Sequence, residues 1–208
     1  MERGFFITLE GIEGSGKSTQ LTKLSEALTK KGYEIVSTRE PGGTPFGQKL
    51  RDLLVHSKDE IIDPELEVFL FLADRAFHVK NVIQPALWQK KIVLSDRFID
   101  STMAYQSFGR KLPFLLLDGM NKFATGGLQP DLTLFLDLPV EDALARIEGR
   151  ENNRMDKESP AFYQTVRKGY YALARKNRRI AVIDAGQPTE TVFEKSLAKI
   201  EEMLKANA

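Results

Sequence analysis

The stretch EGIEGSGKST, residues 10–19, most limits what this chain can fold into. It follows the apolar run FFITL and contains the complete pattern G-x-x-x-x-G-K-[ST], whose fixed positions are Gly11, Gly16, Lys17 and Ser18. Glycines let successive backbone N–H groups point at an anion, and a helix that follows adds the positive end of its dipole. Lys17 can then reach the outer phosphates of a nucleotide, and the Ser18 hydroxyl can contact a magnesium ion. The stretch therefore predicts a nucleotide-phosphate loop between a strand and a helix.

Four further apolar runs predict strands, at residues 33–38, 91–95, 132–136 and 179–183. Helical material separates each run from the next, and this alternation is typical of a parallel sheet covered by helices. We expect one α/β domain over residues 1–208. Three strands run into a polar residue at their carboxyl ends, Glu10, Arg39 and Asp96. Open parallel sheets bind ligands at that edge, so we expect the site there.

Charge and cysteine content exclude several classes of protein. The 208 residues include 30 Lys and Arg against 29 Asp and Glu, a net charge of +1, which gives no electrostatic reason to expect a nucleic-acid or membrane partner. No cysteine is present, so disulfides and thiolate metal sites are excluded. The first strand begins within a few residues of Met1, and no apolar run approaches membrane-spanning length. We therefore expect a soluble cytoplasmic protein.

The strand KIVLSD ends in Asp96 and is followed by Arg97. A carboxylate at the tip of a strand beside the phosphate loop can hold magnesium through water, as the Walker B acid does. A surface ion pair is the alternative. Because Asp96 follows an apolar strand and the strand end faces the loop, we favour the metal role, with Ser18 as the second contact.

The loop TREPGGT, residues 38–44, is a second candidate anion site. Its glycines permit close backbone approach, and Arg39 and Arg51 can fork onto phosphate oxygens, although an ordinary turn with solvated arginines is the alternative. With Arg97 at a neighbouring strand end, the loop suggests a second phosphate site that faces the first. Two facing phosphate sites indicate phosphoryl transfer, which needs charge neutralisation more than it needs a base.

The polar segment at residues 146–158 contains Arg146, Arg150 and Arg154. A solvated charged loop is the usual explanation of such a run. The phosphate loop, however, has no basic residue at its variable positions 12–15, so an arginine must come from elsewhere. We interpret the segment as a short lid that closes over the site.

The chain resembles the bacterial thymidylate kinase family over essentially its whole length. The resemblance rests on EGIEGSGKST, TREPGGT, FLADRAFH, SDRFIDSTMAYQ, PDLTLFLD, NRMDKE and DAGQP, in the order and at the spacing of the family. It implies a P-loop nucleotide kinase fold with five parallel strands in the order two, three, one, four, five. It also implies transfer of a phosphoryl group from ATP to dTMP with Mg²⁺, and a homodimer.

The resemblance assigns roles to individual residues. Around ATP it implies Gly11, Ile12, Glu13, Gly14, Ser15, Gly16, Lys17, Ser18 and Thr19, with Arg146, Gln187 and Pro188 near the adenine. Around the dTMP phosphate and sugar it implies Arg39, Arg51, Arg97, Glu13 and Tyr105, the last crowding the place of a ribose 2′-hydroxyl. Around the thymine it implies Phe71, Arg75, Thr102 and Gln106. Lys17, Arg97, Glu13 and the lid arginine Arg154 would be catalytic.

Two residues depart from the family pattern, and two other functions compete. Phe98 stands where tyrosine is common, and Thr102 where serine or asparagine is. A regulatory GTPase is disfavoured because NKFA, residues 121–124, has Ala124 where the guanine-reading motif needs an acid. A nucleoside kinase would need a general base for a neutral hydroxyl, whereas this site is rich in arginine.

Overall fold

The computed structural model describes residues 3–56, 62–149 and 158–207. Within these ranges five parallel strands form one sheet in the order β2-β3-β1-β4-β5. The strands are β1 (Phe6–Glu10), β2 (Ile35–Arg39), β3 (Ile92–Asp96), β4 (Leu132–Asp137) and β5 (Ile180–Asp184). The predicted fold class and strand order are confirmed.

The strand positions agree with the apolar runs to within one residue at each start, except for β2. The sequence predicts that β2 begins at Tyr33, but it begins at Ile35. The amide of Tyr33 donates to the carbonyl of Leu28 at 3.1 Å and that of Gly32 to Thr29 at 2.9 Å, so both amides still complete the preceding helix. The chain enters the sheet only after this helix end is satisfied.

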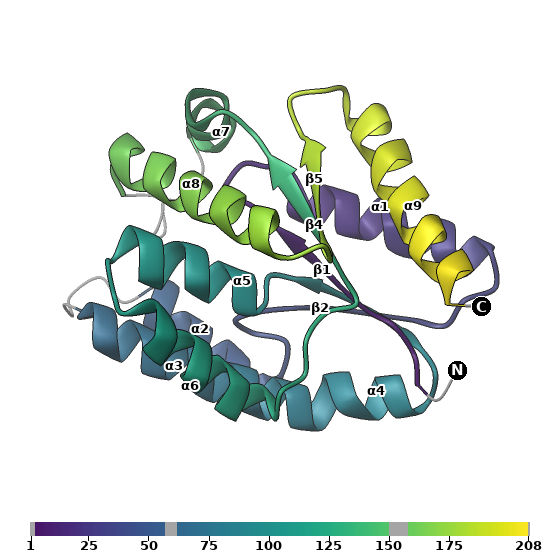
Figure 1. Ribbon diagram of the computed structural model, residues 1–208, viewed down its shortest axis with the longest axis horizontal. Coiled ribbons are helices and arrows are strands. Elements are labelled where there is room, and N and C mark those ends of the chain that lie inside the picture. The colour runs from purple at the N-terminus through teal and green to yellow at the C-terminus, as the bar shows by residue number, and fades with distance from the viewer. Residues whose placement is uncertain (1–2, 57–61, 150–157, 208) are drawn as a thin grey trace.

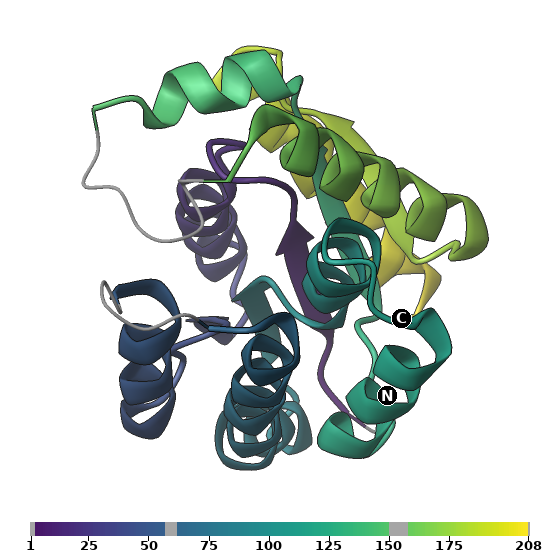
Figure 2. The ribbon, with the colours of Figure 1, turned by 90° about the vertical axis from the view of Figure 1, so that its left-hand side faces the viewer.

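Helices cover both faces of the sheet. Figure 1 shows α1 (Lys17–Lys30) and α9 (Thr189–Ala206) on one side, and α5 (Ile99–Thr102) and α8 (Pro160–Lys176) on the other. Figure 2 shows α2 (Pro45–His56) and α3 (Pro64–His78), in dark blue, packed side by side. The remaining helical elements are η1 (Val79–Ile83), α4 (Gln84–Trp88), η2 (Met103–Gly109), α6 (Phe114–Thr125) and α7 (Val140–Ile147), of which η1 and η2 are π-helical.

The core lies between the central strands and the helices that cover the sheet. Ile7, Leu9, Leu24 and Leu28 are completely buried, as the helical spacing of the leucines predicts. Each such side chain stabilises the fold by roughly 1.5–3 kcal/mol. None of the helices in the described ranges is both long and apolar enough to cross a bilayer.

The register brings the polar strand ends to one edge. Asp96 is the partner of Leu9 on β1 and of Arg39 on β2, so the residues after β1, β2 and β3 lie close together. Since β1 lies between β3 and β4, the loop after β1 emerges near the middle of this edge. The expected site is therefore at the carboxyl edge, where open parallel sheets bind ligands.

Candidate active site

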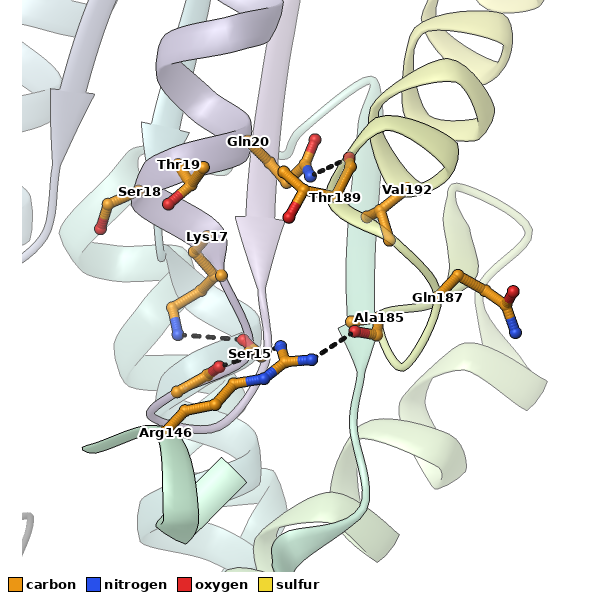
Figure 3. Close-up of a pocket in the computed structure, with 12 residues that line it drawn as sticks. Ser15, Lys17, Ser18, Thr19, Gln20, Arg146, Ala185, Gln187, Thr189 and Val192 are labelled. Carbon is orange, nitrogen blue, oxygen red and sulfur yellow. Dashed lines mark hydrogen bonds between the residues drawn. The ribbon is translucent and has the colours of Figure 1, made fainter. Parts of the chain in front are cut away.

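A cavity of about 540 Å³ lies over the phosphate loop (Figure 3). Residues 14–20 line one side, and Arg146, Ala185, Gln187, Thr189 and Val192 line the other. Gly14 has a φ of 76°, and a Cβ there would lie 2.2 Å from the carbonyl oxygen of Ala143, so a glycine is required where the loop meets α7. The phosphate loop and the segment around Gln187 therefore line the same cavity.

Lys17 turns back onto its own loop. Its ammonium group donates to the carbonyl oxygens of Gly11 at 3.1 Å and Ile12 at 2.9 Å. Burial, assisted by the positive charge of Arg97, lowers the pKa of Lys17 to about 8. Neutral carbonyls compensate the ammonium only in part, so an anion in the cavity would raise this pKa again.

The residues predicted around the adenine differ in their relation to this cavity. Arg146 donates to the carbonyl of Ala185 at 3.3 Å and lies across the mouth of the loop in Figure 3. The side chain of Gln187 points away from Lys17 and donates to Asp184 at 2.9 Å. Pro188, which precedes α9, is exposed and does not line the cavity, although its neighbours Gln187 and Thr189 do.

Ser18, in the first turn of α1, lies in contact with Asp96 at the end of β3. The Ser18 hydroxyl donates to Oδ2 of Asp96 at 3.0 Å, while Oδ1 of Asp96 is buried and has no hydrogen-bond partner among the described residues. An unpartnered buried carboxylate oxygen beside a hydroxyl is a donor set that suits a hard cation. No cluster of three His, Cys, Asp or Glu side chains suited to a metal occurs in the part of the chain that the structure describes.

A second cavity lies beside the first and gathers most of the residues predicted for the acceptor. Its lining includes eight of those nine residues: Glu13, Arg51, Phe71, Arg75, Arg97, Thr102, Tyr105 and Gln106. They come from the phosphate loop, α2, α3, the end of β3, α5 and η2. Arg39 does not line it; this exposed side chain donates to Gln48 at 3.0 Å and lines an open hollow with Ser18 and Asp96.

Arg97 occupies the centre of this cavity's charged end. It has a φ of 74°, a backbone region uncommon for residues other than glycine and often found at functional sites. Its guanidinium donates to Glu13 at 2.7 Å and to the carbonyl of Gly11 at 3.0 Å. Burial opposes ionisation of Glu13, but the charges of Arg97 and Lys17 and a hydrogen bond from Tyr105 outweigh it and lower the pKa of Glu13.

Arg51 lines the charged end of the second cavity. It donates to the carbonyl of Pro41 at 3.1 Å, and no carboxylate among the described residues forms an ion pair with it. Burial and then the nearby charges of Arg39 and Arg97 lower the pKa of Arg51. The positive charges of Arg51 and Arg97 at this end of the cavity, with Arg39 nearby, favour occupation by a multivalent anion.

The other end of the cavity holds Arg75, which is 1% exposed. Its guanidinium donates to Glu40 at 2.8 Å, to Thr102 at 2.9 Å, and to the carbonyl of Phe98 at 2.9 Å. Gln106 donates to Glu67 at 2.7 Å. Phe71 is half-buried and lines the same cavity as these polar groups.

A sequence profile of the thymidylate kinase family matches residues 9–196. The chain belongs to the thymidylate kinase family. It is 48% identical over 209 residues to the thymidylate kinase of Desulfovibrio desulfuricans, with 96% of each chain covered. It is 47% identical over 192 residues to that of Carboxydothermus hydrogenoformans, with 92% of this chain and 94% of the relative covered.

A solved structure agrees with this membership of the thymidylate kinase family. The crystal structure of thymidylate kinase from Ehrlichia chaffeensis matches with a TM-score of 0.78 at 37% identity. The match covers 95% of this chain and 98% of the other. The chain is accordingly a phosphotransferase, as the sequence predicts.

The two departures from the thymidylate kinase pattern lie next to Arg75. Phe98 is completely buried, its ring lies 4.8 Å from that of Phe6, and the guanidinium of Arg75 lies 5.2 Å from its ring centre. The backbone carbonyl of Phe98, which any residue would supply, accepts from Arg75. Thr102 keeps the hydroxyl that accepts from Arg75.

Sequence reasoning missed several residues of the site. Glu10 is buried and accepts hydrogen bonds from the amide of Phe98 at 2.8 Å, the hydroxyl of Ser101 at 2.5 Å and that of Tyr170 at 2.9 Å. Its place at the end of β1 was the available signal. Asn121, considered only as part of a guanine-reading motif, accepts from Arg75 at 2.5 Å.

The predicted lid is only partly within the described residues. Arg146 belongs to α7, and Glu158 at the other end accepts from Arg110 at 2.5 Å. Arg150 and Arg154 lie outside the described residues.

Proposed function

We propose that the cavity over the phosphate loop binds ATP, that the cavity around Arg97 binds dTMP, and that the enzyme transfers the γ-phosphoryl group between them to give dTDP and ADP. One observation carries the proposal. Lys17 and Arg97 donate to the same carbonyl oxygen, that of Gly11, at 3.1 and 3.0 Å, each from its own cavity. A donor phosphate held by Lys17 and an acceptor phosphate held by Arg97 would therefore be neighbours.

The chemistry follows from the charges. The acceptor phosphate carries about −1.5 to −2 charge near neutral pH, so its oxygen is already a nucleophile and no general base is needed. The attacking oxygen forms a bond to the γ-phosphorus as the bond to the β–γ bridging oxygen breaks, and ADP leaves with that oxygen. Arg51 and Arg97 offset the repulsion between two anions, and Lys17 stabilises the charge on the transferred group.

Mg²⁺ is the proposed metal, held by Ser18 and Asp96. The unpartnered Oδ1 of Asp96 and the adjacent hydroxyl fit a cation that prefers oxygen ligands. When bound there, Mg²⁺ would neutralise negative charge that develops on the phosphate oxygens. The hydrogen bond from Ser18 keeps Asp96 oriented toward the loop.

The nucleoside of dTMP is proposed to lie deeper in the second cavity. Phe71 stacks on the thymine, and Arg75, Thr102 and Gln106 surround its polar edge. Glu13 and Tyr105 contact the sugar, and Arg39 lies near the phosphate from the adjoining hollow. For ATP, the whole loop from Gly11 to Thr19 surrounds the phosphates, while Arg146, Gln187 and Pro188 surround the adenine. The lining of the two cavities supports these assignments for all of these residues except Gly11, Ile12, Pro188 and Arg39, which line neither of them.

Arg154 is proposed to supply the catalytic lid arginine. The support is in the sequence: positions 12–15 of the phosphate loop contain no basic residue, and Arg154 lies in the polar segment that follows α7. Segment 146–158 would then close over ATP within a single domain.

A coupled assay tests the function. Purified protein is given ATP or GTP with dTMP, thymidine or other monophosphates, and release of ADP or GDP is measured. We expect dTMP with ATP to be the preferred pair. Phosphorylation of thymidine but not dTMP would indicate a nucleoside kinase, and slow GTP hydrolysis without any acceptor would indicate a regulatory GTPase.

We also propose a homodimer that uses α2 and α3. Phe46 and Phe77 lie in contact across these helices, with ring centres 5.0 Å apart, yet remain 44% and 42% exposed, and Phe69 is 61% exposed. Exposed aromatic groups of this kind often mark protein interfaces. Light scattering should give twice the monomer mass, and Phe69→Asp should shift it toward monomer; a monomeric wild type would exclude this.

A further inference from the structure

A chain of buried polar contacts runs from β2 to the base end of the second cavity. His78, at the end of α3, is completely buried. Its Nε2 lies 2.6 Å from the hydroxyl of Thr38, and its Nδ1 lies 2.9 Å from Oε1 of Glu40. The other carboxylate oxygen of Glu40 accepts from Nε of Arg75 at 2.8 Å. Thr38, His78, Glu40 and Arg75 thus form one connected series.

The carboxylate of Glu40 fixes the direction of two of these hydrogen bonds. A carboxylate can only accept, so Nδ1 of His78 and Nε of Arg75 both donate to it. His78 therefore holds Glu40 from one side, while Arg75 binds it from the other.

The fit around His78 is tight. A Cβ at Gly43 would lie 2.5 Å from both Nε2 of His78 and the Thr38 hydroxyl oxygen, so the loop residue must be glycine for this packing. The imidazole thus joins three parts of TREPGGT to α3, through Thr38, Glu40 and Gly43. The position of Glu40 depends on a ring that does not line the cavity.

Arg75 uses most of its donors within the protein. A guanidinium has five N–H groups, and four of them donate to Glu40, Thr102, Asn121 and the carbonyl of Phe98. The fifth, on Nη2, has no partner among the described residues. Since Arg75 lines the cavity, that N–H is the one left for a ligand, and the other four bonds decide where it points.

We propose that His78 is a positioning residue that holds Glu40, and through it Arg75, so that the free N–H of Arg75 favours a pyrimidine with a carbonyl rather than an amino group at carbon 4. The proposal rests on the proposed binding of dTMP in this cavity. A donor fixed in this way can form a hydrogen bond with the carbonyl oxygen of thymine. In cytosine it would face an amino group, which is itself a donor, so no hydrogen bond could form.

Two variants of His78 separate positioning from simple packing. The side-chain amide of His78→Asn can take the place of Nδ1 and still donate to Glu40, whereas that of His78→Gln reaches the place of Nε2 and leaves Glu40 without its donor. Each is made in the wild type and in Arg75→Ala. The readouts are kcat and KM for dTMP and dCMP, the KM for ATP, and the melting temperature.

We expect His78→Gln to raise the KM for dTMP and to lower the ratio of kcat/KM for dTMP over dCMP by about tenfold, because misplacing a polar contact weakens discrimination. His78→Asn should keep most of that ratio, with the KM for ATP unchanged in both. In the Arg75→Ala background His78→Gln should cause no further loss. An equal effect of the two variants, or a further loss without Arg75, would overturn the positioning role.

Failure of the proposed binding mode gives a different result. If Arg75→Ala leaves the dTMP over dCMP ratio at the wild-type value, Arg75 does not contact the base, and the assignment of the cavity fails together with the role of His78. If Arg75→Ala lowers the ratio and His78→Gln does not, only the role of His78 fails. Thr38→Val, which removes one hydroxyl, provides a milder test if the His78 variants do not fold: it should lower the ratio in the same direction, and an unchanged ratio would refute the proposal.

Discussion

The hydroxyl of Tyr105 donates a hydrogen bond to Oε2 of Glu13 at 2.5 Å, and Arg97 binds the other oxygen of the same carboxylate at 2.7 Å. The guanidinium of Arg97 also lies 5.0 Å from the ring centre of Tyr105. The two side chains therefore hold Glu13 from both sides, and each fixes the other. A phosphate loop, a strand end and a π-helical segment meet at this carboxylate, and π-helical segments are frequent at functional sites.

Tyr105 has two separable properties, a ring that occupies space and a hydroxyl that orients Glu13. We expect Tyr105→Ala to reduce the preference for dTMP over its ribose counterpart, because a steric barrier to the 2′-hydroxyl is removed. Tyr105→Phe keeps the ring and should keep that preference while lowering kcat/KM for both substrates. The measurement is the ratio of specificity constants, and a wild-type ratio in Tyr105→Ala would show that the ring is not the barrier.

Alanine substitution of Lys17 and of Arg97 should impair different steps of the reaction. Lys17→Ala removes the contact with the donor phosphates and should mainly lower kcat. Arg97→Ala removes the acceptor contact, leaves the partly buried Glu13 without its ion-pair partner, and should also weaken dTMP binding, by about 2 kcal/mol or more. Calorimetry of dTMP binding without ATP separates the two, with Arg97→Lys as the control that keeps the charge. Unchanged dTMP affinity in Arg97→Ala would exclude the acceptor role.

Arg154→Ala should lower turnover by roughly a thousandfold or more while dTMP affinity stays nearly intact, since arginines in this role contribute about 10³ to 10⁵ to turnover in other phosphoryl transfers. The measurement is single-turnover transfer at saturating ATP and dTMP, with Arg154→Lys as the charge-retaining control. If Arg154→Ala keeps a rate within a few-fold of wild type, segment 146–158 is a solvated charged loop and not a catalytic lid.

Restoring the lost charge is a further check on Arg154. Moving an arginine into the phosphate loop, as Ser15→Arg, is one route, but Ser15 is only 2% exposed, so the larger side chain would displace the loop. Added guanidine should restore part of the rate to Arg154→Ala without this cost. The same addition should leave Lys17→Ala unaffected.

Stability should depend on pH through Glu10. Burial, and then the negative charge of Asp100, raises the pKa of Glu10 from 4.5 to about 7. The folded state therefore holds a proton that the unfolded state releases, and the stability from this proton, complete below pH 4.5, is lost as pH rises toward 7. Glu10→Gln stays neutral, so its stability relative to wild type should improve between pH 5 and 8, by at most about 3 kcal/mol.

Urea unfolding at the two pH values measures this change, because groups shared by both proteins cancel in the difference. Glu26→Gln is the matched control, since Glu26 is exposed on α1. The stability difference between Glu26→Gln and wild type should stay constant with pH. A constant difference for Glu10→Gln as well would contradict the raised pKa.

Motifs and periodicity were sufficient to predict the sheet and the order of its strands with helices along the chain. Lys17 and Ser18 could be assigned from local spacing because a phosphate loop is built by consecutive residues. Phe71 and Arg75 could not be assigned in that way: a helix pattern alone does not tell a base platform from a core residue, and only the resemblance named them. Their shared cavity agrees with that assignment, while Arg39 lies in a neighbouring hollow instead.

The phosphate loop, the alternation of strands and helices, and the family could be predicted from the sequence, because each depends on residues close together in the chain or on long runs of matching positions. The shared contact of Lys17 and Arg97 with the carbonyl of Gly11, and the link from His78 through Glu40 to Arg75, could be found only in the folded chain. Arg97 lies 86 residues from Gly11, and His78 lies 38 from Glu40. Such contacts depend on which strands are neighbours and on how buried polar groups find partners, and the packing of the whole chain decides both.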